Sequence, residues 1–369
     1  MSSFLELLQV ALGTRDCLSR TPSADEWVAL FNASQAQAIV GNMADGLERL
    51  PREQLPKQEL LLQWIGMCQI IEAQNALHQS VLVKTRDCLA KGGVKVTFMK
   101  GLVCGSRYAN PKRRACGDID FVVDEKNFAK TLDLLETIGK VDRALIHEHH
   151  GMAFVDDVQL EPHYKVHNYQ NPSVDKAMQK MFAEVFPQKL VEIEISGEKI
   201  PVFPPAFECA LLVGHMVNHV YAEGLGMRQV IDLMMFILKE HEVIKTEDCQ
   251  RFLGMMKMER AFRVFAYVCE EYLGMSHKLL NLEFTANEKR FSVKLMNDVL
   301  EVGNFGRGAD YLGSNKAPML LKSYFWVVGR CLKLGYLCPA EARWWPVSKF
   351  KRFWWKKSFG EGHFRMLNN

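Results

Sequence analysis

Two aspartates separated by one apolar residue, Asp118 and Asp120, are the pair in this sequence that most clearly indicates chemistry. The apolar run that follows them, 121–123, favours a β-strand, in which residues two apart lie on the same face. Adjacent carboxylates repel each other unless a cation neutralises them, and their oxygens are good ligands for divalent metals. The pair therefore indicates a metal site, and a solvated strand end is the alternative interpretation. Basic residues that precede it, Lys100 and Arg114 among them, are candidates for counter-charge.

The segment before the aspartates has the layout of a phosphate-binding turn. The β-branched and aromatic run 94–99 predicts a strand, which ends at Lys100-Gly101 and gives way to a predicted helix at 101–109. Glycine lets backbone N–H groups approach an anion closely, and a helix N-terminus favours negative charge. We therefore expect a triphosphate and metal ions to share one cleft.

At these residues the chain resembles the DNA polymerase β-like nucleotidyltransferase superfamily, and within it an uncharacterised bacterial nucleotidyltransferase family. The resemblance covers about residues 60–240 and rests on Lys100-Gly101, Tyr108, Pro111, Arg114 and Asp118-Ile119-Asp120. The superfamily more commonly has Gly-Ser at the turn, and Gly105-Ser106 also fits that spacing. We favour Lys100-Gly101, because it directly follows the strand, whereas Gly105-Ser106 falls inside the predicted helix.

A third carboxylate is expected on a neighbouring strand, and Glu161 is the candidate. The run 158–164 alternates, with apolar residues on one face and Glu161 and His163 on the other. In the resembling family a strand with Glu and His two residues apart occupies this place. Pro162 departs from that pattern and removes a backbone donor, so we expect this strand at an edge or end of the sheet. The polar face of an exposed hairpin is the alternative interpretation.

The resemblance implies transfer of a nucleoside monophosphate from a nucleoside triphosphate to an acceptor hydroxyl, with two metal ions neutralising the reacting oxygens. Asp118, Asp120 and Glu161 would be the catalytic metal ligands. Mg²⁺ is the expected metal, with Mn²⁺ as a substitute, because all of these ligands are oxygens. A nucleotide-binding module without turnover and another metal-dependent phosphoryl-transfer enzyme, such as a kinase, are the alternatives. The acceptor stays open between a small molecule, a sugar and a protein.

The resemblance also assigns the nucleotide side of this cleft. Lys100, the Gly101 amide and Arg114 would hold the phosphates. Arg228 and Asp232 lie one turn apart on a predicted helix. The resembling family has a helix with a His and then an Asp-Leu pair at this place, so Arg228 would reach the triphosphate and Asp232 would orient it. A local ion pair between the two is the alternative interpretation.

Histidines are the candidates for the acceptor side. His215 and His219 lie one turn apart on a predicted helix, and we interpret them as cleft or core histidines, because no Glu stands in the His-Glu-x-x-His order of a zinc site. The segment 147–150, His-Glu-His-His, forms a second cluster, whose neighbouring side chains are expected to point different ways and so not to bind one metal jointly. We place His150, His163 and His219 on the acceptor side.

Composition places the chain among globular proteins. Its 369 residues are 48% hydrophobic and carry a net charge of +3, which is too small to argue for nucleic acid as a partner. Ten cysteines without a CxxC pair suit buried, reduced thiols. The first residues lack the basic segment of a signal peptide, and no apolar run nears the roughly 18 residues of a membrane-spanning helix. We therefore expect a cytoplasmic protein.

The patterns along the chain predict an α+β protein, with a small mixed-sheet, polymerase β-like core between helical regions. We expect an α-helical N-terminal region at 1–92, a nucleotidyltransferase core at 93–203 and an α-helical C-terminal domain at 204–369. The core is predicted to contain strands at 94–99, 119–123, 152–156, 158–166 and 190–195, and helices at 101–109, 126–139 and 173–183. In the helical regions, Ser23 predicts a helix start and Pro51 and Pro56 predict a break.

The C-terminal stretch 343–357 combines basic residues with tryptophans and contains no acid. Contact with a membrane surface is one interpretation of this composition. We favour a solvated basic face over core aromatics, which is the commoner arrangement.

Overall fold

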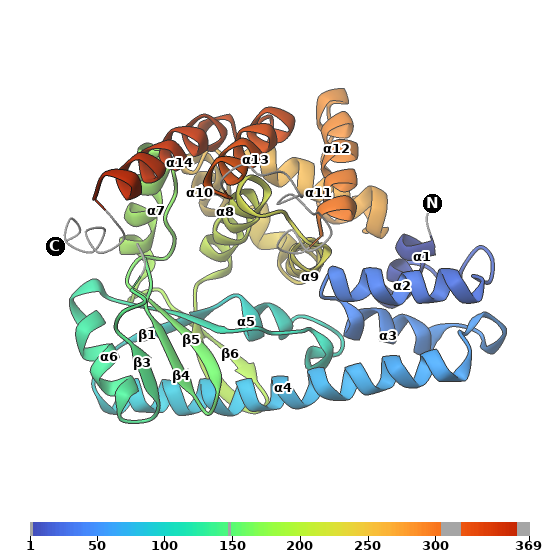
Figure 1. The fold of residues 1–369 in the computed structure, drawn as a ribbon, viewed down its shortest axis with the longest axis horizontal. Helices are drawn as coiled ribbons and strands as arrows, with labels where there is room; N and C mark the ends of the chain where they lie inside the picture. Colours follow the sequence, from blue (N-terminus) through green and yellow to red (C-terminus); the bar gives the residue numbers. More distant parts are fainter. Residues whose placement is uncertain (1–2, 147–148, 304–318, 360–369) are drawn as a thin grey trace.

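The computed structural model of the chain describes residues 3–146, 149–303 and 319–359. A mixed β-sheet lies between helices that precede it and helices that follow it in the chain (Figure 1). The predicted α+β architecture, a mixed-sheet core flanked by helical regions, is confirmed.

The helices before the sheet are α1 (Ser3–Leu12), α2 (Ala24–Ala36), α3 (Val40–Arg49) and α4 (Gln58–Lys91), with a 3₁₀ turn at Arg52–Gln54. Ser23 caps α2 as predicted. Its side chain accepts a hydrogen bond from the backbone N–H of Glu26, whose carboxylate accepts one from the N–H of Ser23. The break predicted at Pro51 and Pro56 separates α3 from the long α4, which runs along the lower side of the sheet in Figure 1.

The sheet consists of β1 (Val96–Met99), β2 (Ile119–Val123), β3 (Lys140–Asp142), β4 (Met152–Val155), β5 (Val158–His163), β6 (Val191–Ile195) and β7 (Glu198–Val202). Their order is β3-β4-β5-β2-β1-β7-β6, so β2 has β1 on one side and β5 on the other. β2 is antiparallel to β1 and parallel to β5. In this register Asp120 stands opposite Met99 and Glu161. Strand pairing therefore brings Asp120 and Glu161 side by side on one face.

Alternation along the strands divides the sheet into an apolar and a polar face. Phe98, Phe121 and Leu160 are buried on the apolar face, against α4 and α6 (Phe128–Glu136). The opposite face carries Asp120 and is turned toward the C-terminal helices. The remaining connecting segments are α5 (Gly101–Gly105), α7 (Pro172–Val185) and the 3₁₀ turns Pro111–Arg113 and Glu125–Asn127.

After the sheet come α8 (Pro205–Ala222), α9 (Met227–Ile244), α10 (Glu247–Met255), α11 (Glu259–Leu273), a 3₁₀ turn (His277–Leu279), α12 (Ala286–Val302), α13 (Met319–Leu334) and α14 (Pro339–Phe359). These helices share one hydrophobic core with the N-terminal helices. Gln37, which follows α2, links the two groups. Its side chain donates to the carbonyl of Val299 and accepts from the N–H of Met227, at 2.7 Å in each case. Within the described residues, no helix is both long enough and apolar enough to cross a membrane.

The structure differs from the sequence predictions at several elements. β3 and β7 are not among the predicted strands, because β3 has only three residues and β7 contains a proline. The predicted helix at 101–109 ends at Gly105. β5 is an interior strand and not the edge strand that Pro162 suggested. Its pairing with β4 stops at Leu160, so the missing N–H of Pro162, the penultimate residue, costs no bond in that ladder.

Side-chain burial can be compared with the sequence predictions for the cysteines and for the C-terminal stretch. Eight of the ten cysteines are buried as expected, but Cys88 is partly exposed and Cys17 is exposed. The basic-aromatic stretch 343–357 lies on α14, and its side chains after residue 351 lie outside the described ones. In the described part Trp345 is buried and Arg343 is exposed.

A buried glutamate on α14, Glu341, fastens the segment that follows β5. It is 1% exposed and accepts hydrogen bonds from the backbone N–H groups of Gln170 and Asn171, at 3.0 Å each. Burial raises the pKa of Glu341 from 4.5 to about 7, against the lowering effect of these two bonds. Between these pH values the folded protein holds a proton that the unfolded chain has lost.

We therefore predict that the contribution of Glu341 to stability is greatest below about pH 4.5, falls as the pH rises, and levels off above about pH 7. The full loss is about 3 kcal/mol of the free energy of unfolding. Glu341→Gln cannot ionise and should lack this loss, so melting temperatures of wild type and variant should diverge from pH 5 to 8. Exposed Glu301→Gln is the control. Parallel pH curves for wild type and Glu341→Gln would contradict the prediction.

Candidate active site

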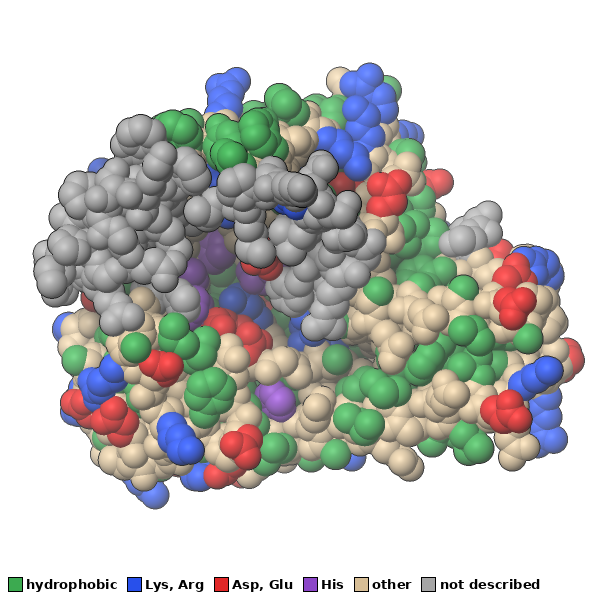
Figure 2. All heavy atoms as spheres, in the orientation of Figure 1, with side chains coloured by type: hydrophobic (Ala, Val, Ile, Leu, Met, Phe, Trp, Pro, Cys, Tyr) green, Lys and Arg blue, Asp and Glu red, His purple; other side chains and the backbone are tan. Residues whose placement is uncertain are grey.

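The three carboxylates predicted as metal ligands meet in one cavity. Asp120 and Glu161 come from the paired strands β2 and β5, and Asp118 lies directly before β2. All three line a cavity of about 310 Å³, whose other wall belongs to α8 and α9. Figure 2 shows histidine, basic and acidic side chains gathered in a hollow between the sheet and the helices above it.

Asp120 is the most strongly held of the three carboxylates. It is 4% exposed, and its Oδ1 lies 2.8 Å from Lys100 Nζ and 2.9 Å from His163 Nε2. Burial acts to raise the pKa of Asp120, but Lys100 and His163 more than offset it and hold the pKa well below its usual value. Lys100 itself keeps a raised pKa, because the pull of Asp120 exceeds the effect of burial. Asp120 and Lys100 therefore form a charged pair.

Asp118 and Glu161 lack comparable neutralisation. Burial, and then the neighbouring charge of Asp120, raise the pKa of Asp118. The same two causes, together with Asp118, raise the pKa of Glu161 to about 7. Lys100 is the only lysine or arginine within ion-pair distance of the three carboxylates in the described part of the chain. The cluster has more buried negative charge than nearby positive charge, so its donor set fits divalent cations.

The turn between β1 and α5 brings backbone close to this cluster. Lys100 has φ 56° and ψ −142°, a conformation that few residues other than glycine adopt. Gly101 follows with φ 29°, and a Cβ there would lie 3.0 Å from Cys116 Sγ and 3.2 Å from the carbonyl oxygen of Asp118. Gly105, in contrast, ends α5 and does not line the cavity. Lys100-Gly101 is thus the turn that faces the carboxylates.

Arg114 and Asp232 form a buried ion pair that joins the sheet core to α9. Arg114 Nη2 and Nε donate to the two Asp232 oxygens at 2.6 and 3.1 Å, and the Tyr108 hydroxyl donates to Asp232 Oδ1 at 2.6 Å. Asp232 therefore pairs with Arg114, 118 positions away, and not with Arg228 on its own helix. Both members line the cavity, but the Arg114 guanidinium is already engaged.

Arg228 is the cavity's uncompensated cation. Its Nη1 donates to the carbonyl of Ala115 at 3.1 Å, its Nε is buried without a hydrogen-bond partner, and no carboxylate among the described residues lies within ion-pair distance. Burial, and then the nearby charge of Arg114, lower the pKa of Arg228. A half-buried guanidinium in this state gains most from an anion entering the cavity.

Six histidines line the same cavity: His149, His150, His163, His167, His215 and His219. Of the three assigned to the acceptor side, His163 contacts Asp120, His150 Nε2 lies 3.8 Å from Glu161 Oε2, and His219 Nε2 lies 3.0 Å from His215 Nε2. Burial is the main cause of the lowered pKa values of His149 and His167, so both rings are neutral at pH 7.

The expectation that His149 and His150 point different ways is wrong. Their ring centroids lie 4.4 Å apart, and both rings are about 5 Å from that of His163, at 5.3 and 5.0 Å. Side chains alternate only in a continuous strand, whereas His149 lies in a bend before the single bridge between His150 and His163. His147 and Glu148, from the same cluster, lie outside the described residues.

His149 and His167 are cavity residues that the sequence did not single out as site residues. His149 appears in the sequence only within the cluster 147–150, and His167 follows β5 in a segment without regular structure. The one local signal in the sequence that places His167 near the site is its position four residues after His163 of β5. His215 was interpreted with His219 as a cleft or core pair, and the pair does line the cavity.

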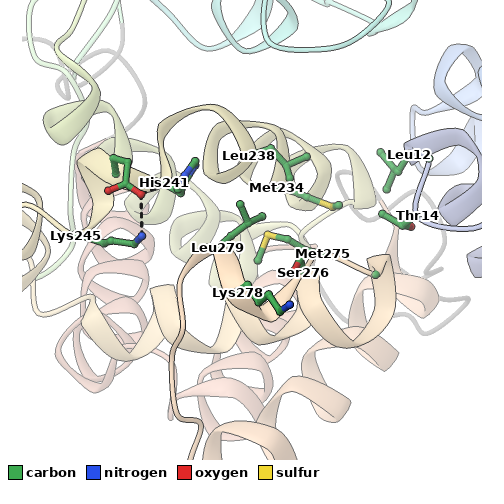
Figure 3. Close-up of a pocket in the computed structure, with 13 residues that line it drawn as sticks. Leu12, Thr14, Met234, Leu238, His241, Lys245, Met275, Ser276, Lys278 and Leu279 are labelled. Carbon is green, nitrogen blue, oxygen red and sulfur yellow. Dashed lines mark hydrogen bonds and ion pairs between the residues drawn. The ribbon is translucent and has the colours of Figure 1, made fainter.

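A second cavity, of about 560 Å³, lies among α1, α9 and the segment after α11 (Figure 3). Its lining is mixed, with apolar side chains such as Leu238, Met234 and Met275 beside polar ones, among them Glu242 and Lys245, which form an ion pair of 2.9 Å. We assign no chemistry to this cavity.

The unequal neutralisation of the two aspartates leads to opposite predicted effects of their amide variants. Without divalent metal, Asp118→Asn should raise the melting temperature, because it removes a half-buried charge that lacks an ion-pair partner and is repelled by Asp120. Asp120→Asn should destabilise the protein by about 3 kcal/mol, because it leaves the Lys100 ammonium buried without its counter-ion. Thermal melting in the presence of a chelator measures both. Equal shifts in the same direction would show that Lys100 does not neutralise Asp120 selectively.

Comparison with known proteins bears on this cluster. Residues 23–274 match the family described as "Uncharacterised nucleotidyltransferase". Among solved structures, the crystal structure of an antigenic nucleotidyltransferase-like protein from Paracoccidioides brasiliensis is similar at 12% identity and a TM-score of 0.33, covering 55% of this chain and 96% of that one. At this TM-score the similarity is too low to assign a fold or a function to this chain. No curated protein matches the chain. The family match spans more than half of the chain and includes the turn and all three carboxylates, and the protein therefore belongs to this family of uncharacterised nucleotidyltransferases.

Proposed function

We propose that the protein transfers a nucleoside monophosphate from a nucleoside triphosphate to a hydroxyl group of an acceptor, with Asp118, Asp120 and Glu161 holding two Mg²⁺ ions. One observation carries the proposal. A single cavity contains one buried and two half-buried carboxylates with too little positive charge and, on the opposite wall, a half-buried arginine without a counter-ion. Cations bound at the carboxylates and phosphates bound at the arginine would neutralise the charges of both cavity walls at once.

Asp120 and Glu161 would have different parts in this reaction. Asp120 lies in the sheet next to Glu161 and two residues after Asp118, so it would be the ligand common to both metal ions. Glu161 would serve the acceptor side, where it would also orient the hydroxyl and take up its proton. When bound, the divalent ions supply charge neutralisation at the attacking and leaving oxygens.

The basic residues would have different roles in binding the phosphates. Arg228 would bind the triphosphate, since its guanidinium has hydrogen-bonding capacity left. The Gly101 amide and Lys100 would approach it from the sheet side. Arg114, with Asp232 and Tyr108, would hold the wall of α9 in place and contribute its charge without a direct bond. This division replaces the direct phosphate role that the sequence suggested for Arg114 with a positioning role.

Nucleotides labelled at either end of the triphosphate test the reaction class. The protein is incubated with Mg²⁺, a clarified cell extract and, in parallel, ATP, GTP, CTP or UTP carrying ³²P at the α- or the γ-phosphate. The proposal predicts α-label on a product together with release of γ-label as pyrophosphate, and no transfer by Asp118→Asn. Transfer of γ-label would identify a kinase. Binding of nucleotide without transfer of either label would identify a binding module.

The role of Arg228 leads to a separate prediction about affinity. Arg228→Ala should weaken binding of Mg²⁺-triphosphate by about 1.5–3 kcal/mol, the size of a charge-assisted hydrogen bond, and should weaken binding of the monophosphate less. Calorimetric titration of both ligands measures the difference. Arg251→Ala is the matched control, because Arg251 is a surface arginine paired with Glu184. Equal losses for triphosphate and monophosphate would place Arg228 away from the β- and γ-phosphates.

A further inference from the structure

The acceptor side of the cavity has ligand types that differ from those on the nucleotide side. His149, His150 and His163 each offer a ring nitrogen, and these three atoms lie within 4.8 Å of one another. The Nε2 atoms of His150 and His163 are each 3.8 Å from Glu161 Oε2. On the nucleotide side, Asp118 and Asp120 offer carboxylate oxygens. Imidazole ligands suit Zn²⁺ and related transition metals, whereas Mg²⁺ takes oxygen ligands.

Two of the three histidines retain a ring nitrogen that a metal could use. Nδ1 of His149 and Nδ1 of His163 are buried and have no hydrogen-bond partner, and His163 is 1% exposed. Buried polar atoms without a partner destabilise a fold unless a ligand satisfies them. His163 also donates through Nε2 to the Asp120 carboxylate, a contact of the kind that orients metal-binding histidines.

The backbone holds these rings in place. His150 forms a β-bridge with His163, and the N–H of Gly151 donates to the carbonyl of Pro162 at 2.9 Å. The carbonyl of His149 accepts the N–H of Tyr164 at 3.0 Å. The segment that carries His149 and His150 is thereby fastened to the end of β5, next to Glu161. A trio of histidines on fastened backbone, with one side open to a cavity, matches three-histidine zinc sites that keep one position for water or substrate.

We propose that His149, His150 and His163 bind a transition metal ion of the Zn²⁺ type beside Glu161. The cavity would then hold the two Mg²⁺ ions at the three carboxylates and, beside Glu161, a histidine-bound ion of a different kind that faces the acceptor. The catalytic part of this assignment rests on the proposed nucleotidyl transfer, whereas the binding of the ion does not. An ion at this place would coordinate an oxygen or nitrogen of the acceptor and fix its position before the phosphates arrive.

The experiment is a titration of the full-length, chelator-treated protein with Zn²⁺ in a buffer containing millimolar Mg²⁺ and no nucleotide. We expect one equivalent of Zn²⁺ to bind, and Co²⁺ used as a probe to give the intense visible absorption of a tetrahedral site. His149→Ala and His150→Ala should each raise the Kd by at least about tenfold. The more conservative His149→Gln and His150→Gln guard against loss of the fold, which thermal melting monitors.

Two control variants show whether the ion binds at these histidines and independently of the aspartates. His277→Ala removes an exposed histidine paired with Glu270 and should leave the titration unchanged. Asp118→Asn, which should abolish nucleotidyl transfer, should also leave Zn²⁺ binding intact, so failure of the proposed function and failure of this site are distinguishable. Absence of a Zn²⁺ equivalent in the presence of Mg²⁺, or unchanged affinity in the His149 and His150 variants, would overturn the assignment.

Discussion

The position of Asp120 at the centre of the sheet is the constraint on which the rest of the site depends. β2 lies between β1 and β5, so the residue at this position must have the end of β1 on one side and Glu161 on the other. A carboxylate buried there is tolerated because Lys100 and His163 contact it directly. The unusual backbone of Lys100 and the glycine after it follow from the same requirement, since the chain must turn sharply where β1 ends.

The opposite wall of the cavity is held in place by a buried ion pair between two protein side chains. Arg114 and Asp232 join the segment before β2 to α9, and Tyr108 completes the group. Breaking such a buried pair by removing one member leaves an uncompensated charge, which costs about 3–5 kcal/mol. The pair therefore fixes the distance between the sheet and α9, and with it the width of the cavity beside Arg228.

Much of the site follows from local patterns, because a strand's alternation places side chains on a face without knowledge of the fold. The strand at 119–123 and the common face of Glu161 and His163 were predictable for this reason. The partner of Asp232 was not, because Arg114 lies 118 positions away and a neighbour at i, i+4 competed for the assignment. The convergence of six histidines was predicted only in part. His150, His163 and His219 were placed together, whereas His149 and His167 join them only because the sheet and α8 bring three separate segments into one cavity.

The family match ends at residue 274, yet Glu341 of α14 holds the backbone of Gln170 and Asn171, close to His167 in the cavity wall. A helix that supplies none of the three carboxylates thus sets the position of a segment beside the histidines. Sequence changes in α14 can therefore reshape that side of the cavity while the carboxylates and Arg228 stay as they are. Such a division separates the part of the chain that shapes the histidine-lined side of the cavity from the part that carries the carboxylates.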